Sequence, residues 1–206
     1  NNSCSGASGG GAIDFFVFNL TSSTVTVTGC SFSGNSCTSS SGGAIVNESA
    51  NVTITKSTFL NNSGNVAGGG IYAAGNMTNV SFCRFKGNTA PTGKQIAVNG
   101  ASVLMTANNN WWAVNTGPGV NDAVASGGAI LTLTKWLMYT HVPGVSEICA
   151  NNSTSLTASF LVNSAGEMIS TSNLPVVIGL PITFNNAQPS GSSISAAQAT
   201  IQRNGQ

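Results

Sequence analysis

The chain has 206 residues, enough for one or two domains, and it carries very little charge. Asp, Glu, Lys and Arg make up 5% of it and the formal net charge is +1, whereas these residues make up about 25% of an average soluble protein. The six basic residues form no cluster, which excludes a nucleic-acid-binding face. Asn, Ser, Thr and 25 glycines supply the polarity and favour strands and turns. The composition predicts an all-β protein.

Residues 174–180 form the most apolar stretch, but Pro175 and Gly179 interrupt it. It is far shorter than the roughly 20 residues of a membrane-spanning helix. We therefore expect no membrane span in this segment. The sequence opens on Asn1 without an initiator Met or a signal peptide, which favours a processed or excised segment.

The N-terminal half contains an internal repeat of 27 residues. Gly42-Gly-Ala-Ile45 recurs as Gly69-Gly-Ile-Tyr72, and Phe-x-x-Asn recurs at spacings of 27 and 26 residues. The members of the second motif are Phe32 with Asn35, Phe59 with Asn62, and Phe85 with Asn88. A unit of this size cannot bury its own apolar side chains, so it stacks on its neighbours as parallel strands about 4.8 Å apart. The repeat predicts a right-handed parallel β-helix of about four coils.

Stacking predicts columns of inward side chains: Val27, Ile54 and Val80; Phe32, Phe59 and Phe85; Ile13, Ile45 and Ile71. Asn35, Asn62 and Asn88 follow the phenylalanines at a constant offset. We expect them to form a structural ladder that satisfies backbone groups from coil to coil. An earlier Gly-Gly-Ala-Ile at residues 10–13 precedes the one at 42–45 by 32 residues. The first interval is therefore expected to hold an insertion, which we place at residues 38–41.

The pattern degenerates after residue 103. Residues 103–105 and 108–112 are expected to form a last coil, with Trp111 in the phenylalanine column and Trp112 facing outward, because neighbours in a strand face opposite sides. Residues 129–137 are expected to form a strand that closes the open end of the solenoid. We expect Trp111, Trp112 and Trp136 to pack at that end, with a sugar-stacking platform as the alternative.

A second module is expected over residues 139–206, after the β-helix of residues 1–138. The alternating segments 155–162 and 181–184, separated by turns, indicate an immunoglobulin-like β-sandwich. Such a sandwich needs about 100 residues and seven strands, so this one is incomplete. Either the sequence stops before its last strands, or a strand from a neighbouring subunit completes it. In the second case the first coil offers a further docking surface, and head-to-tail contacts that do not close produce filaments.

The paired Gly-Gly-Ala-Ile and Phe-x-x-Asn motifs, over residues 9–90, resemble the repeats of chlamydial polymorphic outer-membrane proteins. The continuation resembles even more the adhesin-like β-helix proteins of methanogenic archaea, in which an immunoglobulin-like module follows. It consists of Asn109-Asn-Trp-Trp112, Asn115-x-Gly-Pro118 and Trp136-Leu137. Ala113 departs from that family, which has glycine there, and the Gly-Gly-Ala-Ile at 127–130 lies outside the repeat. Both families are cell-surface proteins, so the resemblance implies adhesion or a structural surface role without catalytic residues.

Enzymatic activity is not expected. Some parallel β-helices degrade pectin, which needs carboxylates clustered for acid/base work or around calcium. The acids here are scattered along the chain: Asp14, Glu48, Asp122, Glu147 and Glu167. His141 is the single histidine and there is no Cys-x-x-Cys, so neither a catalytic triad nor a metal site is predicted. We expect no catalytic residue, metal or cofactor.

The cysteines are five, an odd number. Cys4 and Cys37 nearly superpose on adjacent coils and are candidates for a disulfide, with Cys30 and Cys37 as the competing local pair. Cys30 and Cys83 lie two coils apart, about 9.6 Å, which is too far to bridge. We expect Cys83 and Cys149 to be free and buried, or joined to a group outside this sequence.

Nine Asn-x-Ser/Thr sequons are candidate glycosylation sites: Asn1, Asn19, Asn47, Asn51, Asn61, Asn76, Asn79, Asn151 and Asn152. Chance produces sequons in a chain this rich in Asn, Ser and Thr, whereas in a secreted protein several would carry glycans. Either reading fits the cell exterior better than the cytosol.

We therefore expect an extracellular structural or adhesive surface protein. Its expected partners are copies of itself, joined into a filament by strand complementation, or a host or cell-surface receptor. The alternatives are a carbohydrate-binding β-helix, which an exposed row of aromatic side chains would favour, and a polysaccharide lyase, which three converging carboxylates would favour.

Overall fold

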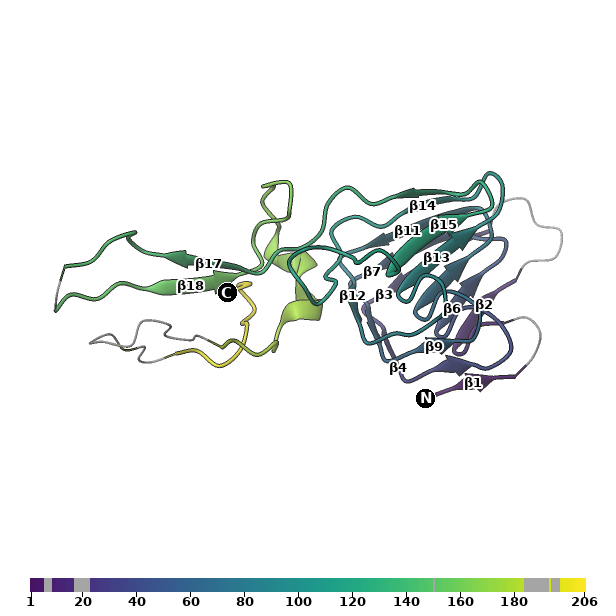
Figure 1. The fold of residues 1–206 in the computed structure, drawn as a ribbon, viewed down its shortest axis with the longest axis horizontal. Helices are drawn as coiled ribbons and strands as arrows, with labels where there is room; N and C mark the ends of the chain where they lie inside the picture. Colours follow the sequence, from purple (N-terminus) through teal and green to yellow (C-terminus); the bar gives the residue numbers. More distant parts are fainter. Residues whose placement is uncertain (6–8, 17–22, 150, 184–192, 194–196) are drawn as a thin grey trace.

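The computed structural model describes residues 1–5, 9–16, 23–149, 151–183, 193 and 197–206. Strands β1–β16 wind into a parallel β-solenoid of about four turns, and the rest of the described chain projects from its side (Figure 1). The solenoid strands are β1 (Ser3–Cys4), β2 (Ile13–Phe15), β3 (Thr24–Thr28), β4 (Ser31–Ser33), β5 (Ser36–Cys37), β6 (Ile45–Asn47), β7 (Asn51–Thr55), β8 (Thr58–Leu60), β9 (Ser63–Gly64), β10 (Ile71–Ala73), β11 (Met77–Ser81), β12 (Arg84–Lys86), β13 (Ile96–Asn99), β14 (Leu104–Thr106), β15 (Ala123–Ser126) and β16 (Ile130–Thr132). Among the residues described, no helix is long and apolar enough to cross a membrane.

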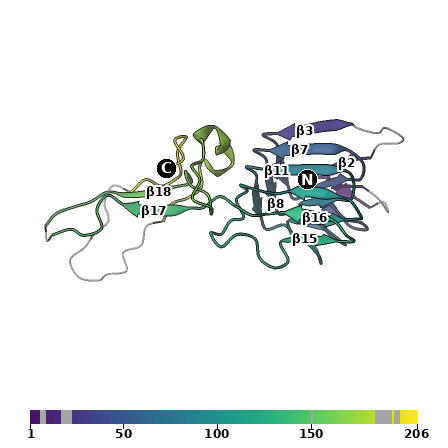
Figure 2. The ribbon, with the colours of Figure 1, turned by 90° about the horizontal axis from the view of Figure 1, so that it is seen from above.

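The strands form four parallel sheets, which we call faces A to D, and each of the first three coils contributes one strand to each face. Face A is β1-β5-β9, face B is β2-β6-β10-β13-β15, face C is β3-β7-β11-β14-β16, and face D is β4-β8-β12. Figure 2 shows β3, β7 and β11 of face C lying in succession. Faces B and C thus continue beyond faces A and D by two strands each, β13 and β15 on face B and β14 and β16 on face C.

Alternating residues of each strand fill the core. On face C, Val27 pairs with Ile54 and Ile54 with Val80, and all three side chains are buried. On face B the column holds Ile13, Ile45, Ile71 and Ile96 in register. Ile96 belongs to a coil without a Gly-Gly pair, so the repeat motif does not predict its place in the column. Burial of each such side chain stabilises the fold by about 1.5–3 kcal/mol.

The Gly-Gly pairs lie one residue away from the alignment expected from sequence. Because Ile45 pairs with Ile71, Gly42 corresponds to Gly68 rather than to Gly69. The reason is a shorter connection: residues 65–70 join β9 to β10, whereas residues 38–44 join β5 to β6. Gly42 and Gly68 both have positive φ, 70° and 63°, and a Cβ on Gly42 would lie 2.6 Å from the Ile45 carbonyl oxygen. Glycine is therefore required at the corner that enters face B.

Two further expectations about the coils are wrong. The extra residues of the first coil do not lie at 38–41, because residues 16–23 join β2 to β3 whereas only residues 48–50 join β6 to β7. The segment 129–137 does not close the solenoid, because β16 pairs in parallel with β14, as β15 does with β13. One more turn therefore follows the coil that was expected to be the last.

The aromatic column on face D continues through Trp112, not Trp111. The rings of Phe32, Phe59, Phe85 and Trp112 stack with centroid separations of 4.9, 4.9 and 5.0 Å. Trp112 follows Phe85 by 27 residues, so the repeat length places it in the column. Trp111 points to the opposite side and meets Phe160 edge-on at 4.9 Å. Both tryptophans are buried, so the outward exposure expected for Trp112 is also wrong.

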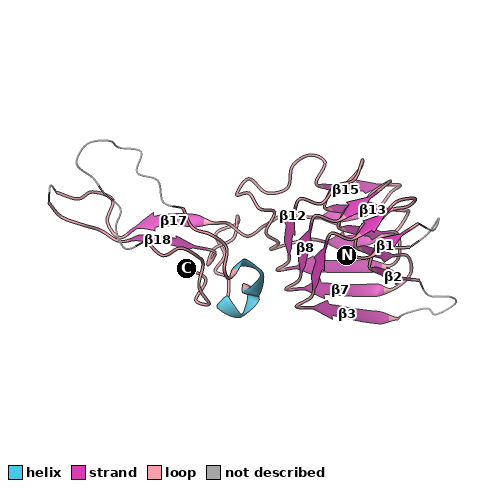
Figure 3. Ribbon diagram, turned by 90° about the horizontal axis from the view of Figure 1, so that it is seen from below, coloured by secondary structure: helices cyan, strands magenta, loops and turns pink. Residues whose placement is uncertain are grey.

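The remaining elements lie beside face D. Strands β17 (Thr140–Pro143) and β18 (Leu156–Ser159) pair antiparallel, and two 3₁₀ helices, η1 (Thr171–Asn173) and η2 (Pro175–Val177), follow (Figure 3). Isolated bridges join Val162 to Met168 and Pro181 to Thr200. Within the described residues this is one two-stranded sheet, fewer strands than a complete sandwich has. Phe184, the end of one expected strand, lies outside the described residues.

Candidate functional site

The apolar core is incompletely covered at both ends of the solenoid. The side chains that pack against the core but remain partly exposed belong to the first and the last coil: Ala12, Ile13, Phe15 and Val25; then Ala123, Ala129, Leu131, Leu133 and Trp136. Their counterparts in the middle coils, such as Ile45, Ile71 and Val52, are buried. The two ends therefore present two apolar surfaces of the same cross-section.

The strand edges are open at the same two places. Among the described residues, β1 to β4 are each paired on one side only, and so are β15 and β16. Open edges of parallel sheets present unpaired N–H and C=O groups and recruit further strands. The two ends are complementary, because faces B and C begin with β2 and β3 and end with β15 and β16.

The C-terminal elements meet the last coil at one corner, beside face D, where Asn163 bridges Leu137 in the antiparallel sense. Figures 1 and 2 show β17 and β18 extending away from the stacked strands. The contacts lie at the corner beside face D: Asn163 Nδ2 donates to Asn109 Oδ1 at 2.9 Å, and Ser164 N–H donates to the Trp136 carbonyl at 2.9 Å. Lys135 pairs with Glu167 at 2.7 Å. This packing leaves β15 and β16 accessible.

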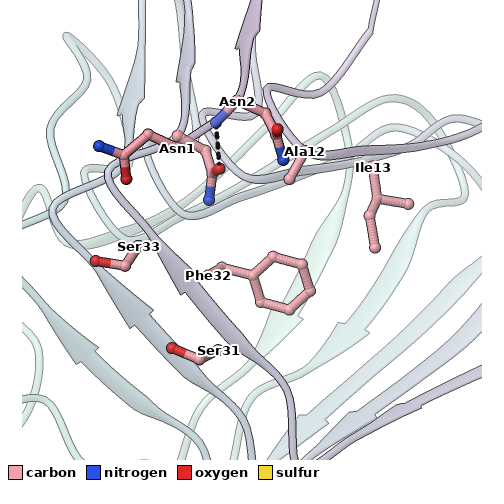
Figure 4. Close-up of a pocket in the computed structure, with 8 residues that line it drawn as sticks. Asn1, Asn2, Ala12, Ile13, Ser31, Phe32 and Ser33 are labelled. Carbon is pink, nitrogen blue, oxygen red and sulfur yellow. Dashed lines mark hydrogen bonds between the residues drawn. The ribbon is translucent and has the colours of Figure 1, made fainter.

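A hollow of about 410 Å³ lies at the first coil. Figure 4 shows Phe32 and Ile13 within it, beside Ser31, Ser33 and Asn1. Phe32 ends the aromatic stack here, with one neighbouring ring, Phe59, in the described chain. The backbone N–H of Asn2 donates to Asn35 Oδ1 at 2.9 Å, which joins the chain's first residues to the asparagine ladder.

Asn35, Asn62 and Asn88 form a buried ladder on the turn after face D. The backbone N–H and the Nδ2 of Asn35 both donate to Asn62 Oδ1 at 2.9 Å. The same two groups of Asn62 donate to Asn88 Oδ1 at 2.8 Å, and Asn62 Nδ2 also reaches the Phe32 carbonyl at 3.0 Å. Every polar atom of the Asn62 side chain is thus used within the protein, so the ladder holds coils together and offers nothing to a ligand.

The outward side of face C is uncharged along its length. One column runs through residues in register: Thr26, Thr53, Asn79, Thr106 and Thr132. Beside it lies an apolar row of Met77, Leu104 and Ile130, which are 48%, 42% and 59% exposed. The five strands contain no Asp, Glu, Lys or Arg. This surface suits an uncharged partner.

Two acids lie closer than their register positions suggested. Asp14 pairs with Val46, two residues before Glu48, whose N–H donates to the Phe15 carbonyl at 3.1 Å. Burial raises the pKa of the Asp14 carboxyl, and burial together with the Asp14 charge raises the pKa of Glu48. Among the described residues no three His, Cys, Asp or Glu side chains gather where they could hold a metal. This pair therefore lacks the third group that a lyase or a metal site would need.

Replacement of Glu48 by glutamine is expected to make stability less dependent on pH. A carboxyl whose pKa is raised in the folded chain contributes most to stability below its ordinary pKa, and that contribution is lost as pH rises through the folded value. E48Q should therefore raise the unfolding free energy at pH 7 by up to about 0.5 kcal/mol, a small effect because solvent screens the partly exposed pair. Urea unfolding at pH 7 and pH 4 measures this, with E147Q as a control. An equal effect of E48Q at both pH values would contradict the assignment.

Two of the five cysteines lie next to each other, and the other three are separate. Cys4 pairs with Cys37 in register, and the Cys37 thiol donates to Cys4 Sγ at 3.1 Å. Cys30 is exposed, and its thiol donates to the Thr28 carbonyl at 3.5 Å. Cys83 is buried, and burial raises the pKa of its thiol to about 12. Cys149 is exposed, contrary to the expectation that it is buried.

The sequons differ in accessibility. Asn1, Asn61, Asn76, Asn151 and Asn152 are exposed, Asn51 and Asn79 are half-buried, and Asn19 lies outside the described residues. Asn47 is 0% exposed, and its Nδ2 donates to the Ala50 carbonyl and to Thr78 Oγ1, both at 2.9 Å. A glycan on Asn47 is incompatible with this fold, whereas the exposed sites present no such obstacle.

The tryptophans do not form a sugar platform. Trp111 and Trp112 are 8% and 5% exposed, and the Nε1 of the half-buried Trp136 donates to the Asn115 carbonyl at 2.8 Å. His141 meets the ring of Tyr139 edge-on at 4.8 Å. An exposed aromatic row is therefore not formed by these residues.

Comparison with known proteins adds no relative: no family model, no curated protein and no solved structure matches this chain.

Proposed function

We propose that this chain is a non-enzymatic, extracellular structural protein of a cell surface that assembles head-to-tail. The last coil of one copy stacks on the first coil of the next, so β15 and β16 add to the edges of β2 and β3. The observation that carries the proposal is the position of the partly exposed core residues, which all belong to the two terminal coils. Stacking copies would bury both apolar surfaces and pair both sets of edges.

Composition and surface support the same role. The wall of the solenoid is built from Thr, Ser and Asn ladders and bears few charges, and such a surface does not depend on salt as an electrostatic interface does. Glycans at the exposed sequons and an adhesive contact with a receptor belong to this proposal. So does the finer assignment of residues 139–206 as an incomplete immunoglobulin-like sandwich, for which the antiparallel pair β17–β18 is the support. The resemblance to adhesin-like β-helix proteins agrees with a surface role.

Substitution of Thr26 by proline tests the assembly. Gly29 N–H donates to the Thr55 carbonyl, and Asn51 N–H donates to the Ser23 carbonyl. The backbone N–H and C=O groups of the odd-numbered residues of β3 therefore point toward β7. Since backbone groups alternate along a strand, the N–H of Thr26 faces the open edge. T26P therefore removes a donor from the docking edge without removing an internal hydrogen bond.

Sedimentation velocity over a concentration series is the measurement. Wild-type protein is expected to form a ladder of oligomers, and T26P to shift that ladder at least tenfold in concentration. T26V, which keeps the N–H and the β-branched shape, should behave as wild type. Wild-type protein that stays monomeric at every concentration would refute the proposal.

A carbohydrate-binding role is the second candidate. It is favoured by the exposed row Met77, Leu104 and Ile130 beside the hydroxyl and amide column of face C, because apolar and hydroxyl-rich strips together suit sugar rings. Binding of wild-type monomer to uncharged polysaccharides, lost in L104D, would support it. A lyase has weaker support, since the described acids form at most a pair.

A further inference from the structure

Cys4 and Cys37 are placed as the two halves of a disulfide. They are direct neighbours in the parallel ladder of face A, the position at which Cα atoms of adjacent strands lie about 4.8 Å apart, inside the range that a disulfide spans. Their sulfur atoms are 3.1 Å apart. Both sulfur atoms also lie near the Gly9 carbonyl oxygen, at 3.6 Å from Cys4 and 3.3 Å from Cys37. The separation of 3.1 Å shows that the two sulfur atoms are already in contact.

We propose that Cys4 and Cys37 form a disulfide on exposure to an oxidising medium and that this bond fastens β1 to the solenoid. The proposal does not depend on head-to-tail assembly.

The two cysteines have different roles in the reaction. Cys4 is half-buried, whereas Cys37 is 2% exposed, so a small disulfide such as oxidised glutathione reaches Cys4 first. The Cys4 thiolate attacks that disulfide, which forms a mixed disulfide and releases one glutathione thiolate. Cys37 then loses its proton to solvent, and its sulfur attacks Cys4 Sγ and expels the second glutathione thiolate. The protein loses two electrons and two protons, and the oxidant is reduced to two thiols.

Cys37 is the less reactive thiol toward an outside oxidant. Burial, and then the hydrogen bond with Cys4, raise the pKa of the Cys37 thiol, so it stays protonated while Cys4 reacts first, and its attack on Cys4 depends on their proximity. The competing partner Cys30 is exposed, and its thiol is directed to the Thr28 carbonyl. The geometry thus selects Cys4 over Cys30.

The bond would matter because β1 is held by few contacts. It has two residues, and its ties to the second coil include Ser36 N–H to the Asn2 carbonyl and Thr38 N–H to the Cys4 carbonyl, both 2.9 Å. A disulfide closes a ring from residue 4 to residue 37 and lowers the entropy of the unfolded chain. Residues 1–5 should consequently exchange amide protons more slowly in the oxidised protein.

Intact mass and peptide mapping after incubation of the native chain with oxidised glutathione test the proposal. The peptides of Cys4 and Cys37 are expected to be recovered joined, about 2 Da lighter than the sum of the two reduced peptides, and the thermal midpoint to rise by about 5–10 °C. C30S should behave as wild type. C4S should show neither the bond nor the rise in thermal midpoint. Its Cys37 should also carry no glutathione, because that side chain is buried. A bond mapped to Cys30–Cys37, or Cys4 and Cys37 peptides that stay separate, would overturn the inference.

If C4S is too unstable to purify, alkylation of native wild-type protein also tests whether Cys4 enters the disulfide. Cys4 should be alkylated before oxidation and not after it, and after oxidation it should carry no glutathione, unlike the exposed Cys30 and Cys149. Reactivity of Cys4 that oxidation does not change would count against the disulfide.

Discussion

Replacement of Phe59 by alanine is expected to lower the unfolding free energy by about 3–5 kcal/mol. The side chain is 0% exposed and its ring stacks on both sides, on Phe32 and on Phe85, at 4.9 Å each. Deletion of the ring leaves a cavity in the middle of the aromatic column, which neighbouring coils cannot close because their spacing is fixed by the strand ladders.

Urea unfolding followed by circular dichroism measures the loss. V120A is the control, because Val120 is fully exposed at 102% and its truncation should change stability by less than about 0.5 kcal/mol. A loss below 1 kcal/mol in F59A would show that the aromatic column is not part of the folded core.

Replacement of Asn62 by alanine is expected to cost about 3 kcal/mol or more, although it removes no apolar packing. The substitution leaves the buried backbone N–H of Asn35 without its partner and removes one donor to the Phe32 carbonyl. It also removes the acceptor of Asn35 Nδ2 and the donor to Asn88 Oδ1. Each buried polar group that loses its partner costs about 1–3 kcal/mol.

The matched control is N65A, because Asn65 is an exposed asparagine three residues later. Its loss should be within about 0.5 kcal/mol of wild type. If N62A and N65A have the same unfolding free energy in the same urea titration, the ladder does not stabilise the solenoid.

The repeated coils could be predicted because their interior side chains recur at the length of one turn. Phe32, Phe59 and Phe85 occupy one column, and a column in a solenoid needs the same side-chain shape in each coil. Val27, Ile54 and Val80 follow for the same reason. The fold class therefore needs only the spacing and the residue types.

The details that failed are those that depend on connection lengths. One residue fewer between β9 and β10 shifts the Gly-Gly alignment. Trp111 and Trp112 are adjacent and both aromatic, so residue type alone does not show which of them enters the phenylalanine column. The sequence also does not reveal the corner between faces C and D, where one residue of each coil has a left-handed backbone. These residues are Gly29, Lys56, Phe82 and Asn109, with φ of 65°, 51°, 54° and 57°. Only one of these four is glycine, so the residue types do not mark the corner.

The exposed ends of the solenoid could not be predicted from the sequence for a different reason. Ile13 and Leu131 are ordinary core residues in the sequence, and only their places in the first and last coils leave them partly exposed. The alternation of residues 129–137 and their Trp136-Leu137 end predict a closing strand, yet β16 has the same parallel pairing as the strands before it. Whether a strand has an open edge is a property of the assembled solenoid.

The most direct test of head-to-tail assembly is the length of filaments grown from mixtures of wild-type and T26P protein. T26P has a blocked first coil but an intact last coil, so its last coil can still dock on a wild-type first coil, and that filament end then stops growing. At a concentration at which pure T26P forms no filaments, negative-stain microscopy should show wild-type filaments that shorten steadily as the T26P fraction rises. Filaments whose length is independent of the T26P fraction, or wild-type protein that remains as single particles, would contradict the account.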